Sequence, residues 1–153
     1  MSRLAGIPIR VEPPARVDGL GGGVTAILHE IVRRLERLAA ASEPSAIDLR
    51  SLPMSPLDRT ELKRALGEGE VHATLNAEGL STIQETRIPG VWWIEHRDPQ
   101  DQLIAELIDV NYVPDILARV TGEIAAGARA LSEQIAQAAA AAAGRGGTSA
   151  GRQ

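Results

Sequence analysis

Apolar residues recur every three or four positions between residues 24 and 42, and polar residues take the other side of the helical wheel. The apolar positions are Val24, Ile27, Leu28, Ile31, Leu35 and Leu38. Because this spacing places them along one side of a 3.6-residue repeat, it predicts an amphipathic helix. Pro44 follows closely, so we expect the helix to end near Ser42.

Two further helices are predicted, one in the middle of the chain and one near its end. Ser55 is a capping residue type, and Pro56 is favoured at the first helical position, so a helix begins there and ends at Gly67. Residues 46–50 before it are a short strand or an extended connection. The last helix begins at Pro114. Its apolar stripe is Leu117, Val120, Ile124, Leu131 and Ile135, with Ala128 between.

The region between these helices has the pattern of β-structure. Alternating or β-branched residues predict four strands, at residues 71–75, 80–88, 91–97 and 103–110. The links between them are short and contain turn residues such as Pro89-Gly90, which suits hairpins and an antiparallel meander. The fold class predicted is therefore α+β, a four-stranded, mainly antiparallel sheet with helices packed on one face.

The positions of the stretches rich in proline, glycine and alanine predict how the chain is divided. Residues 1–23 are a Pro/Gly-rich lead-in, and residues 24–137 form a single α+β domain with a long C-terminal helix. Residues 138–153 are an Ala/Gly-rich tail that we expect to be disordered. No apolar run has the character of a membrane span or a signal peptide, so the prediction is a cytoplasmic protein that does not interact with membranes.

Composition and charge exclude several classes of function. Residues 42–121 carry 7 basic and 14 acidic side chains, a net charge of −7, which argues against nucleic-acid binding and favours a partner with a basic patch. The chain has no Cys, so it has no Cys nucleophile, no disulfide and no Cys-ligated iron–sulfur cluster. Of the 16 basic residues only Lys63 is a lysine.

The chain shows no motif that specifies catalysis or a bound cofactor. Gly19 to Gly23 precede a helix without the Gly-Lys-Ser/Thr continuation of a phosphate loop, which favours a joint and helix start. The three histidines, His29, His72 and His96, lie on different predicted elements and none forms a helical ligand pair. A His/carboxylate metal site assembled by the fold stays open as an alternative.

The adjacent Trp92 and Trp93 are two of only three aromatic residues in the chain. Neighbouring residues of a strand point to opposite faces, so we expect one indole in the core and the other on an outer face. The alternative is that both are buried, since Trp is highly buried on average. An exposed Trp among aliphatic and acidic side chains is typical of a protein-binding surface.

Several short motifs, in order along the chain, resemble the hydrogenase expression/formation proteins of the HupH/HyaF type. They cover about residues 24–120, and the most specific is Pro-Gly-Val-Trp-Trp. The motifs are Ala26–Ile31, Leu35–Leu38, Ile47–Pro53, Leu66–Val71, Glu85–Trp93 and Val113–Leu117. The resemblance implies a non-catalytic accessory role in [NiFe] hydrogenase maturation, as a chaperone or scaffold for a subunit precursor, often the iron–sulfur small subunit.

We therefore expect a non-enzymatic protein without a cofactor, whose partner is a hydrogenase subunit precursor or another maturation protein. Trp93 and Glu95 are predicted to face outward, with Trp92 supporting the core. The candidate protein-binding residues are Pro89, Gly90, Trp92, Trp93, Glu95, His96 and Arg97. A homodimer formed through the open sheet face or the long C-terminal helix, without a hydrogenase client, is the other alternative.

Overall fold

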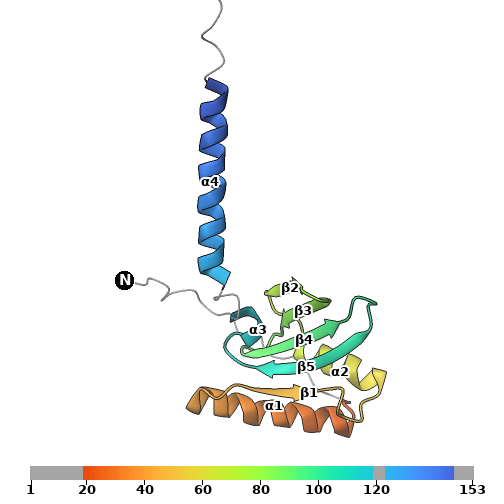
Figure 1. Ribbon diagram of the computed structural model, residues 1–153. Helices are drawn as coiled ribbons and strands as arrows, with labels where there is room; N and C mark the ends of the chain where they lie inside the picture. The colour runs from red at the N-terminus through yellow and green to blue at the C-terminus, as the bar shows by residue number, and fades with distance from the viewer. Residues whose placement is uncertain (1–18, 119–122, 147–153) are drawn as a thin grey trace, which may run out of the picture. The chain divides into compact units, whose positions relative to one another are not determined.

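A computed structural model describes residues 19–118 and 123–146, which divide into two compact units. In the unit Met1–Pro114, the helices and strands are α1 (Gly22–Ala41), β1 (Ser45–Asp48), α2 (Pro56–Leu66), β2 (His72–Asn76), β3 (Leu80–Glu85), β4 (Val91–Arg97) and β5 (Leu103–Val110). In the unit Asp115–Gln153 they are α3 (Asp115–Ala118) and α4 (Ile124–Gly146) (Figure 1).

The sheet has five strands in the order β1-β5-β4-β3-β2, and every neighbouring pair is antiparallel. The predicted α+β class and the meander β2–β5 are confirmed, but the predicted count of four strands is wrong. The additional strand is β1, which pairs with β5 from Ser45 opposite Val110 to Asp48 opposite Leu107. A four-residue strand shows too little alternation to be distinguished from an extended connection, and only its partner defines it.

Helices α1 and α2 cover one face of the sheet, and α1 lies beside β1 and β5 (Figure 1). The core forms between these layers because α1 presents the apolar stripe that its spacing predicted. The buried cluster consists of Val24, Ile27, Ile31 and Leu38 of α1, Leu62 and Leu66 of α2, and Ile47, Leu49, Val91, Trp93, Ile108 and Val110 from the sheet and its edge.

Helix α2 begins where the Ser-Pro pair predicted. The Ser55 hydroxyl accepts a hydrogen bond from the Asp58 backbone N–H at 3.1 Å, and the Asp58 carboxylate accepts one from the Ser55 N–H at 2.8 Å. This reciprocal capping box satisfies two amide donors that would otherwise have no partner in the helix. The hydrogen bonds from Ser55 hold the pKa of the Asp58 carboxyl below its ordinary value.

Strand β3 is shorter than predicted, ending at Glu85 instead of residue 88. The Thr86 N–H donates to the Val91 carbonyl oxygen at 3.0 Å, so the chain already turns toward β4 at this point. Strands β4 and β5 have the predicted bounds. Period-two alternation therefore located the strands, and the turn geometry decided where β3 ends.

The chain divides into two compact units after Pro114. The single domain over residues 24–137 stays a prediction. Helix α4 continues through the alanine tract to Gly146, so the tail predicted to be disordered from residue 138 is helical over its first nine residues, as the high helix propensity of alanine allows. Residues 1–18, most of the predicted lead-in, residues 119–122, including Val120, and residues 147–153 lie outside the described residues.

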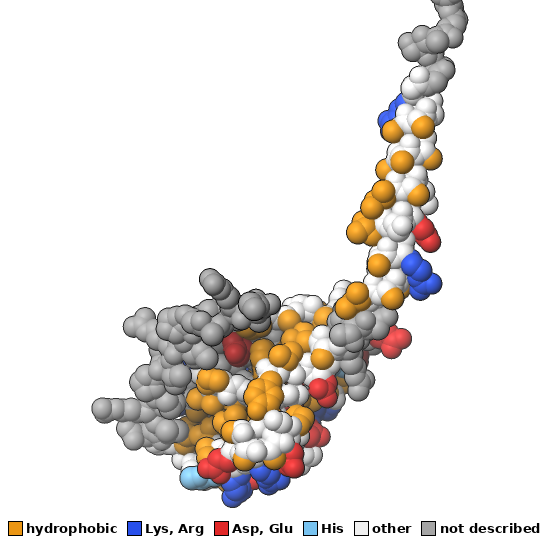
Figure 2. All heavy atoms as spheres, turned by 90° about the vertical axis from the view of Figure 1, so that its left-hand side faces the viewer, with side chains coloured by type: hydrophobic (Ala, Val, Ile, Leu, Met, Phe, Trp, Pro, Cys, Tyr) orange, Lys and Arg blue, Asp and Glu red, His pale blue; other side chains and the backbone are white. Residues whose placement is uncertain are grey.

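Every residue of α4 is exposed, including the large aliphatic residues Ile124, Leu131 and Ile135. Figure 2 shows hydrophobic side chains along this helix. Neither α4 nor any other helix in residues 19–118 and 123–146 combines the length and apolarity needed to cross a membrane.

Candidate functional site

The predicted Pro89-Gly90 turn joins β3 to β4. The Val91 N–H donates to the Ile88 carbonyl oxygen at 3.0 Å, which closes a four-residue turn. Gly90 has a φ of 83°, a left-handed conformation that glycine adopts without strain, as the third residue of a type II turn requires. The turn is also tied to the end of β5, because the Asn111 N–H donates to the Gly90 carbonyl oxygen at 3.0 Å. The start of β4 is therefore fixed from both sides.

The seven candidate residues do not form one surface. Strand alternation places Trp93, Glu95 and Arg97 on the face that the helices cover, and the cross-strand pairs of Trp93 with Ile108 and of Glu95 with Glu106 confirm this. Trp92 and His96 lie on the opposite face. Pro89 and Gly90 lie in the turn before the strand.

The assignment of the two indoles is reversed relative to the prediction. Trp93 belongs to the core cluster with α1 and α2 and is 5% exposed, so the expectation that it faces outward is wrong. Trp92 is 6% exposed on the other face, outside that cluster. The alternative in which both indoles are buried is the one the structure shows. The sequence did not decide between the faces because β5 carries apolar residues on both of its sides.

On the Trp92 face the indole nitrogen is satisfied within the fold. Trp92 Nε1–H donates to the Asn111 carbonyl oxygen at 3.1 Å. The neighbouring row of this face, Ile83 and Ile94, is also buried. Trp92 is thus held by a local hydrogen bond as well as by apolar neighbours, which is the usual arrangement for a buried indole.

On the Trp93 face the surroundings of the indole are charged. Lys63 Nζ lies 4.7 Å from the centroid of the Trp93 ring, in cation–π range, and donates to Glu95 Oε1 at 2.5 Å. Trp93 Nε1 itself is buried and has no hydrogen-bond partner in the described part of the chain. Glu95 is half-buried and also lies 3.8 Å from the Arg97 guanidinium. Trp93, Glu95 and the single lysine of the chain therefore form one contact group.

Two ion pairs hold α2 to the sheet. Glu95 and Glu106 are directly opposite each other on β4 and β5, an arrangement that would be repulsive without counter-charges. Lys63 pairs with Glu95, and Arg59 Nε donates to Glu106 Oε2 at 2.9 Å. Arg59 and Lys63 are four residues apart and so lie on one side of α2. The pairs therefore link one side of α2 to the adjacent strands β4 and β5.

A cavity of about 350 Å³ opens beside Trp93, at the end of α2. Its lining includes Lys63 and Arg64 of α2, Glu68 after the helix, Arg87 after β3, and Trp93. Three of these five side chains are cationic and one is anionic. We call this cavity the Trp93 pocket.

Sequence reasoning identified Trp93 and Glu95 but missed Lys63, Arg64 and Arg87. The helix pattern placed Lys63 and Arg64 near the end of α2, where basic residues are common because they oppose the helix dipole. Their contact with β4 depends on how α2 crosses the sheet, which the spacing of residues does not encode. The only available signal was that Lys63 is the single lysine in a chain that otherwise uses arginine.

The histidines are not brought together. His72 pairs with Gln84 on the helix-covered face, whereas His96 lies on the opposite face, where its Nδ1 is 2.6 Å from Ser81 Oγ. His29 is exposed on α1. Within residues 19–118 and 123–146 no group of three or more His, Cys, Asp or Glu side chains could hold a metal ion. A metal site combining His72 with His96 is therefore excluded by the register of the sheet.

Comparison with known proteins supports the motif resemblance. The model of the family described as "HupH hydrogenase expression protein, C-terminal conserved region" matches residues 23–138. The chain belongs to this family. The match includes α1, α2, all five strands and the first part of α4.

Named relatives and a solved structure agree with this membership. The chain is 33% identical over 119 residues to the hydrogenase expression/formation protein HoxQ of Azotobacter vinelandii, covering 76% of the chain and 41% of HoxQ. It is 28% identical over 120 residues to the hydrogenase-1 operon protein HyaF of Escherichia coli K12, covering 78% of the chain and 41% of HyaF. The hydrogenase expression protein HupH from Thiobacillus denitrificans has a solved structure that matches at 39% identity with a TM-score of 0.72, covering 76% of the chain and 98% of that structure.

The chain spans about two fifths of the length of the curated relatives it matches, between 38% and 43% for the first four. These relatives are hydrogenase expression/formation or hydrogenase operon proteins by name. The comparisons therefore place the chain in a family named for hydrogenase expression.

Proposed function

We propose that this protein is a non-catalytic chaperone or scaffold in [NiFe] hydrogenase maturation and that it binds a hydrogenase subunit precursor, most simply the small subunit. The observation that carries the proposal is the family match over residues 23–138, together with relatives named for hydrogenase expression and formation. The proposal includes a cytoplasmic location and action on a polypeptide client, without catalysis.

The chemistry of the chain supports a role in handling a polypeptide. With no Cys in its sequence, the protein cannot itself ligate an iron–sulfur cluster through thiolates. The Trp93 pocket instead offers an aromatic wall and cationic side chains, and Trp and Arg are the residue types enriched where proteins bind one another. We place the client surface at this pocket and at the adjoining Glu95 and Arg97. Trp92 and His96 lie on the other face and are not part of it.

Co-expression with a defined client tests the proposal. The tagged 153-residue chain is produced together with the small-subunit precursor of a [NiFe] hydrogenase, and separately with the mature small subunit, and captured by its tag. We expect the precursor to be retained and the mature subunit to be lost. A photo-crosslinking residue at Glu68, on the rim of the pocket, should capture the precursor, whereas one at Arg37 on α1 should not. Retention of neither form would contradict the proposed function.

Self-association through α4 is a second candidate, favoured by one specific observation. Ile124, Leu131 and Ile135 are each at least 59% exposed and are spaced seven and four residues apart, which places them along one side of the helix. We expect sedimentation velocity to show a dimer that becomes a monomer when Leu131 and Ile135 are both replaced by Gln. An unchanged sedimentation coefficient in the variant would exclude α4 as the interface.

A further inference from the structure

We propose that the Trp93 pocket is a binding site for a carboxylate, supplied by an acidic side chain of a partner polypeptide. This inference deepens the proposed function and rests on it for the nature of the partner as a polypeptide. The site itself is built from residues of one compact unit, Met1–Pro114. Three observations support the inference: the net positive charge of the lining, the two arginine side chains without an ion-pair partner among the described residues, and the apolar surface of the aromatic wall.

The charge of the pocket is opposite to that of its surroundings. Residues 42–121 have a net charge of −7, yet the charged side chains that line the pocket are Lys63, Arg64 and Arg87 against Glu68. One cation, Lys63, is neutralised by Glu95, which leaves a local excess of positive charge. Such a local excess attracts a single negative group, while the acidic remainder of the region repels a polyanion such as a nucleic acid.

The side chains of the two arginines of the pocket have no partner among the described residues. Neither Arg64 nor Arg87 makes a side-chain hydrogen bond or ion pair within residues 19–118 and 123–146. By contrast, Arg59 is committed to Glu106 and Lys63 to Glu95. A guanidinium presents a planar set of donors that matches the two oxygens of a carboxylate, so the two arginines can take up an acidic group without breaking an internal contact.

The aromatic wall favours a side chain with methylene groups over a bare ion. The Trp93 ring is apolar surface beneath Lys63, and Leu66 also lines the pocket. The buried Nε1–H of Trp93 also has no acceptor among the described residues. A volume of about 350 Å³ is at the lower end of ligand pockets, which suits one or two side chains of an extended peptide.

Nuclear magnetic resonance of the full 153-residue chain tests the site directly. The chain has two Trp residues, so its indole N–H region contains two signals, which Trp93→Phe assigns. The probe is the end-blocked peptide Gly-Leu-Glu-Leu-Gly, and the control is the same peptide with Gln in place of Glu. We expect the Glu peptide to shift the Trp93 signal, to leave the Trp92 signal unchanged on the opposite face, and to bind at least tenfold more tightly than the Gln peptide.

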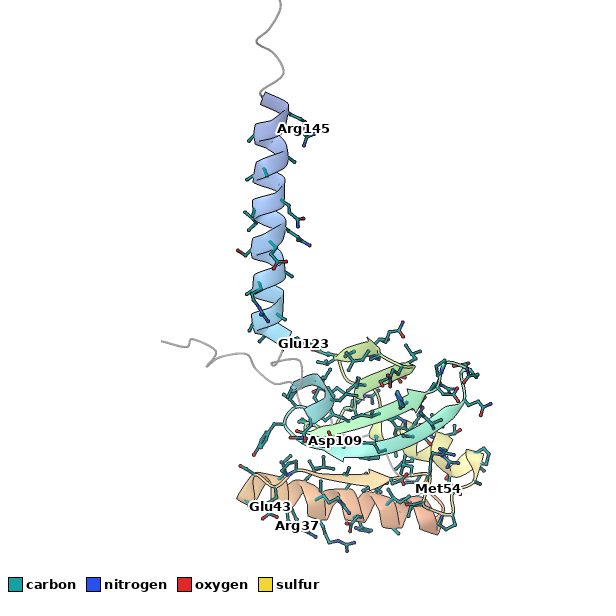
Figure 3. All side chains as sticks on the ribbon, viewed as in Figure 1. Arg37, Glu43, Met54, Asp109, Glu123 and Arg145 are labelled. Atoms are coloured by element: carbon teal, nitrogen blue, oxygen red, sulfur yellow. The ribbon has the colours of Figure 1, made fainter. Side chains whose placement is uncertain are left out.

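Matched variants identify the residues responsible. Arg64→Gln with Arg87→Gln should weaken binding of the Glu peptide at least tenfold. Arg37→Gln should not, because Arg37 projects from α1 away from the sheet (Figure 3). If the double variant loses its dispersed spectrum, Arg64→Glu provides the test instead, and it should reverse the preference toward a Gly-Leu-Lys-Leu-Gly peptide.

Two results would overturn the inference. Equal binding of the Glu and Gln peptides would exclude a carboxylate site. An equal shift of the Trp93 signal by sodium acetate or inorganic phosphate at the same concentration would show that the pocket takes free anions and not a polypeptide. No hydrogenase subunit is present in this experiment, so its failure would leave the capture of a precursor unaffected. Failure of the capture would likewise leave the carboxylate site unaffected.

Discussion

The two indoles of β4 are adjacent in sequence and almost equally buried, at 6% and 5% exposed, yet their surroundings differ in kind. Trp92 donates its N–H to the Asn111 carbonyl oxygen and has the apolar neighbours Ile83 and Ile94 on its face. Trp93 lies beneath an ammonium group, beside an ion pair and in the wall of a cavity, and its N–H has no partner in the described chain.

The comparison teaches that the exposed fraction of a side chain does not by itself separate a structural residue from a functional one. Both indoles contribute apolar area to the fold. What distinguishes them is how the polar atom of each indole is satisfied. The Trp92 N–H has an acceptor within the fold, whereas the Trp93 N–H has none among the described residues.

The largest expected effect comes from removing either indole. Trp92→Ala and Trp93→Ala should each lower the free energy of unfolding by about 3–5 kcal/mol, because both replace a buried aromatic side chain by a cavity. Urea denaturation followed by circular dichroism measures this. A loss below about 1 kcal/mol for Trp93→Ala would place Trp93 at the surface and break the comparison.

Breaking the two ion pairs of the Trp93 face should cause smaller losses of stability, and the two losses should differ. Arg59→Met leaves Glu106, which is 3% exposed, without its counter-ion and should cost about 2–3 kcal/mol. Lys63→Met breaks a more exposed pair and should cost less than about 1 kcal/mol. The same denaturation experiment compares them, and equal losses would show that burial of the carboxylate is not what sets the cost.

The conservative replacement of each indole compares their hydrogen bonds. Trp92→Phe and Trp93→Phe remove similar volumes, but only Trp92→Phe also removes a hydrogen bond made within the fold. We expect Trp92→Phe to be less stable than Trp93→Phe by about 1 kcal/mol. The urea denaturation midpoints of the two variants test this expectation. A lower midpoint for Trp93→Phe than for Trp92→Phe would mean that the Trp93 N–H has a partner in solution.

The cap of α2 gives the smallest effect and a pH dependence. Ser55→Ala should cost about 1 kcal/mol at neutral pH, because α2 loses its side-chain cap. The pKa of Asp58 is lowered in the folded protein, so this carboxylate stabilises the fold above its ordinary pKa of 3.8 and loses that contribution as the pH falls through the folded value. The difference in the free energy of unfolding between the wild type and Ser55→Ala, measured by urea denaturation, should therefore become smaller in acid. A difference in unfolding free energy that does not change with pH would contradict the capping box.

Much of the fold followed from patterns that act locally. The bounds of α2, β4 and β5 were predictable because a capping serine, alternation and turn residues each act within a few positions. The fifth strand was not, since β1 is defined by its pairing with residues 107–110. The end of α4 was missed because a polyalanine tract has no amphipathic pattern but a high helix propensity.

The candidate site was only half predictable from the sequence. The motif around Trp93 and Glu95 marked the right strand, and alternation separated its two faces correctly. Which face the helices cover could not be predicted, because Leu107 and Ile108 are both apolar and point in opposite directions. Lys63, Arg64 and Arg87 join the site only through the crossing of α2 over the sheet, a long-range arrangement that no local spacing records.

The position of β1 at the edge of the sheet has a consequence for the order of folding. The meander β2–β5 closes through short turns, whereas β1 reaches β5 only after about 60 intervening residues, a loop whose closure costs about 2 kcal/mol more entropy than a five-residue turn. Contacts with low sequence separation form first. We therefore expect the meander, which places Trp92 and Trp93 opposite their partners on β3 and β5, to form first. Strand β1 should then join it late, and hydrogen exchange should show its amide protons exchanging early.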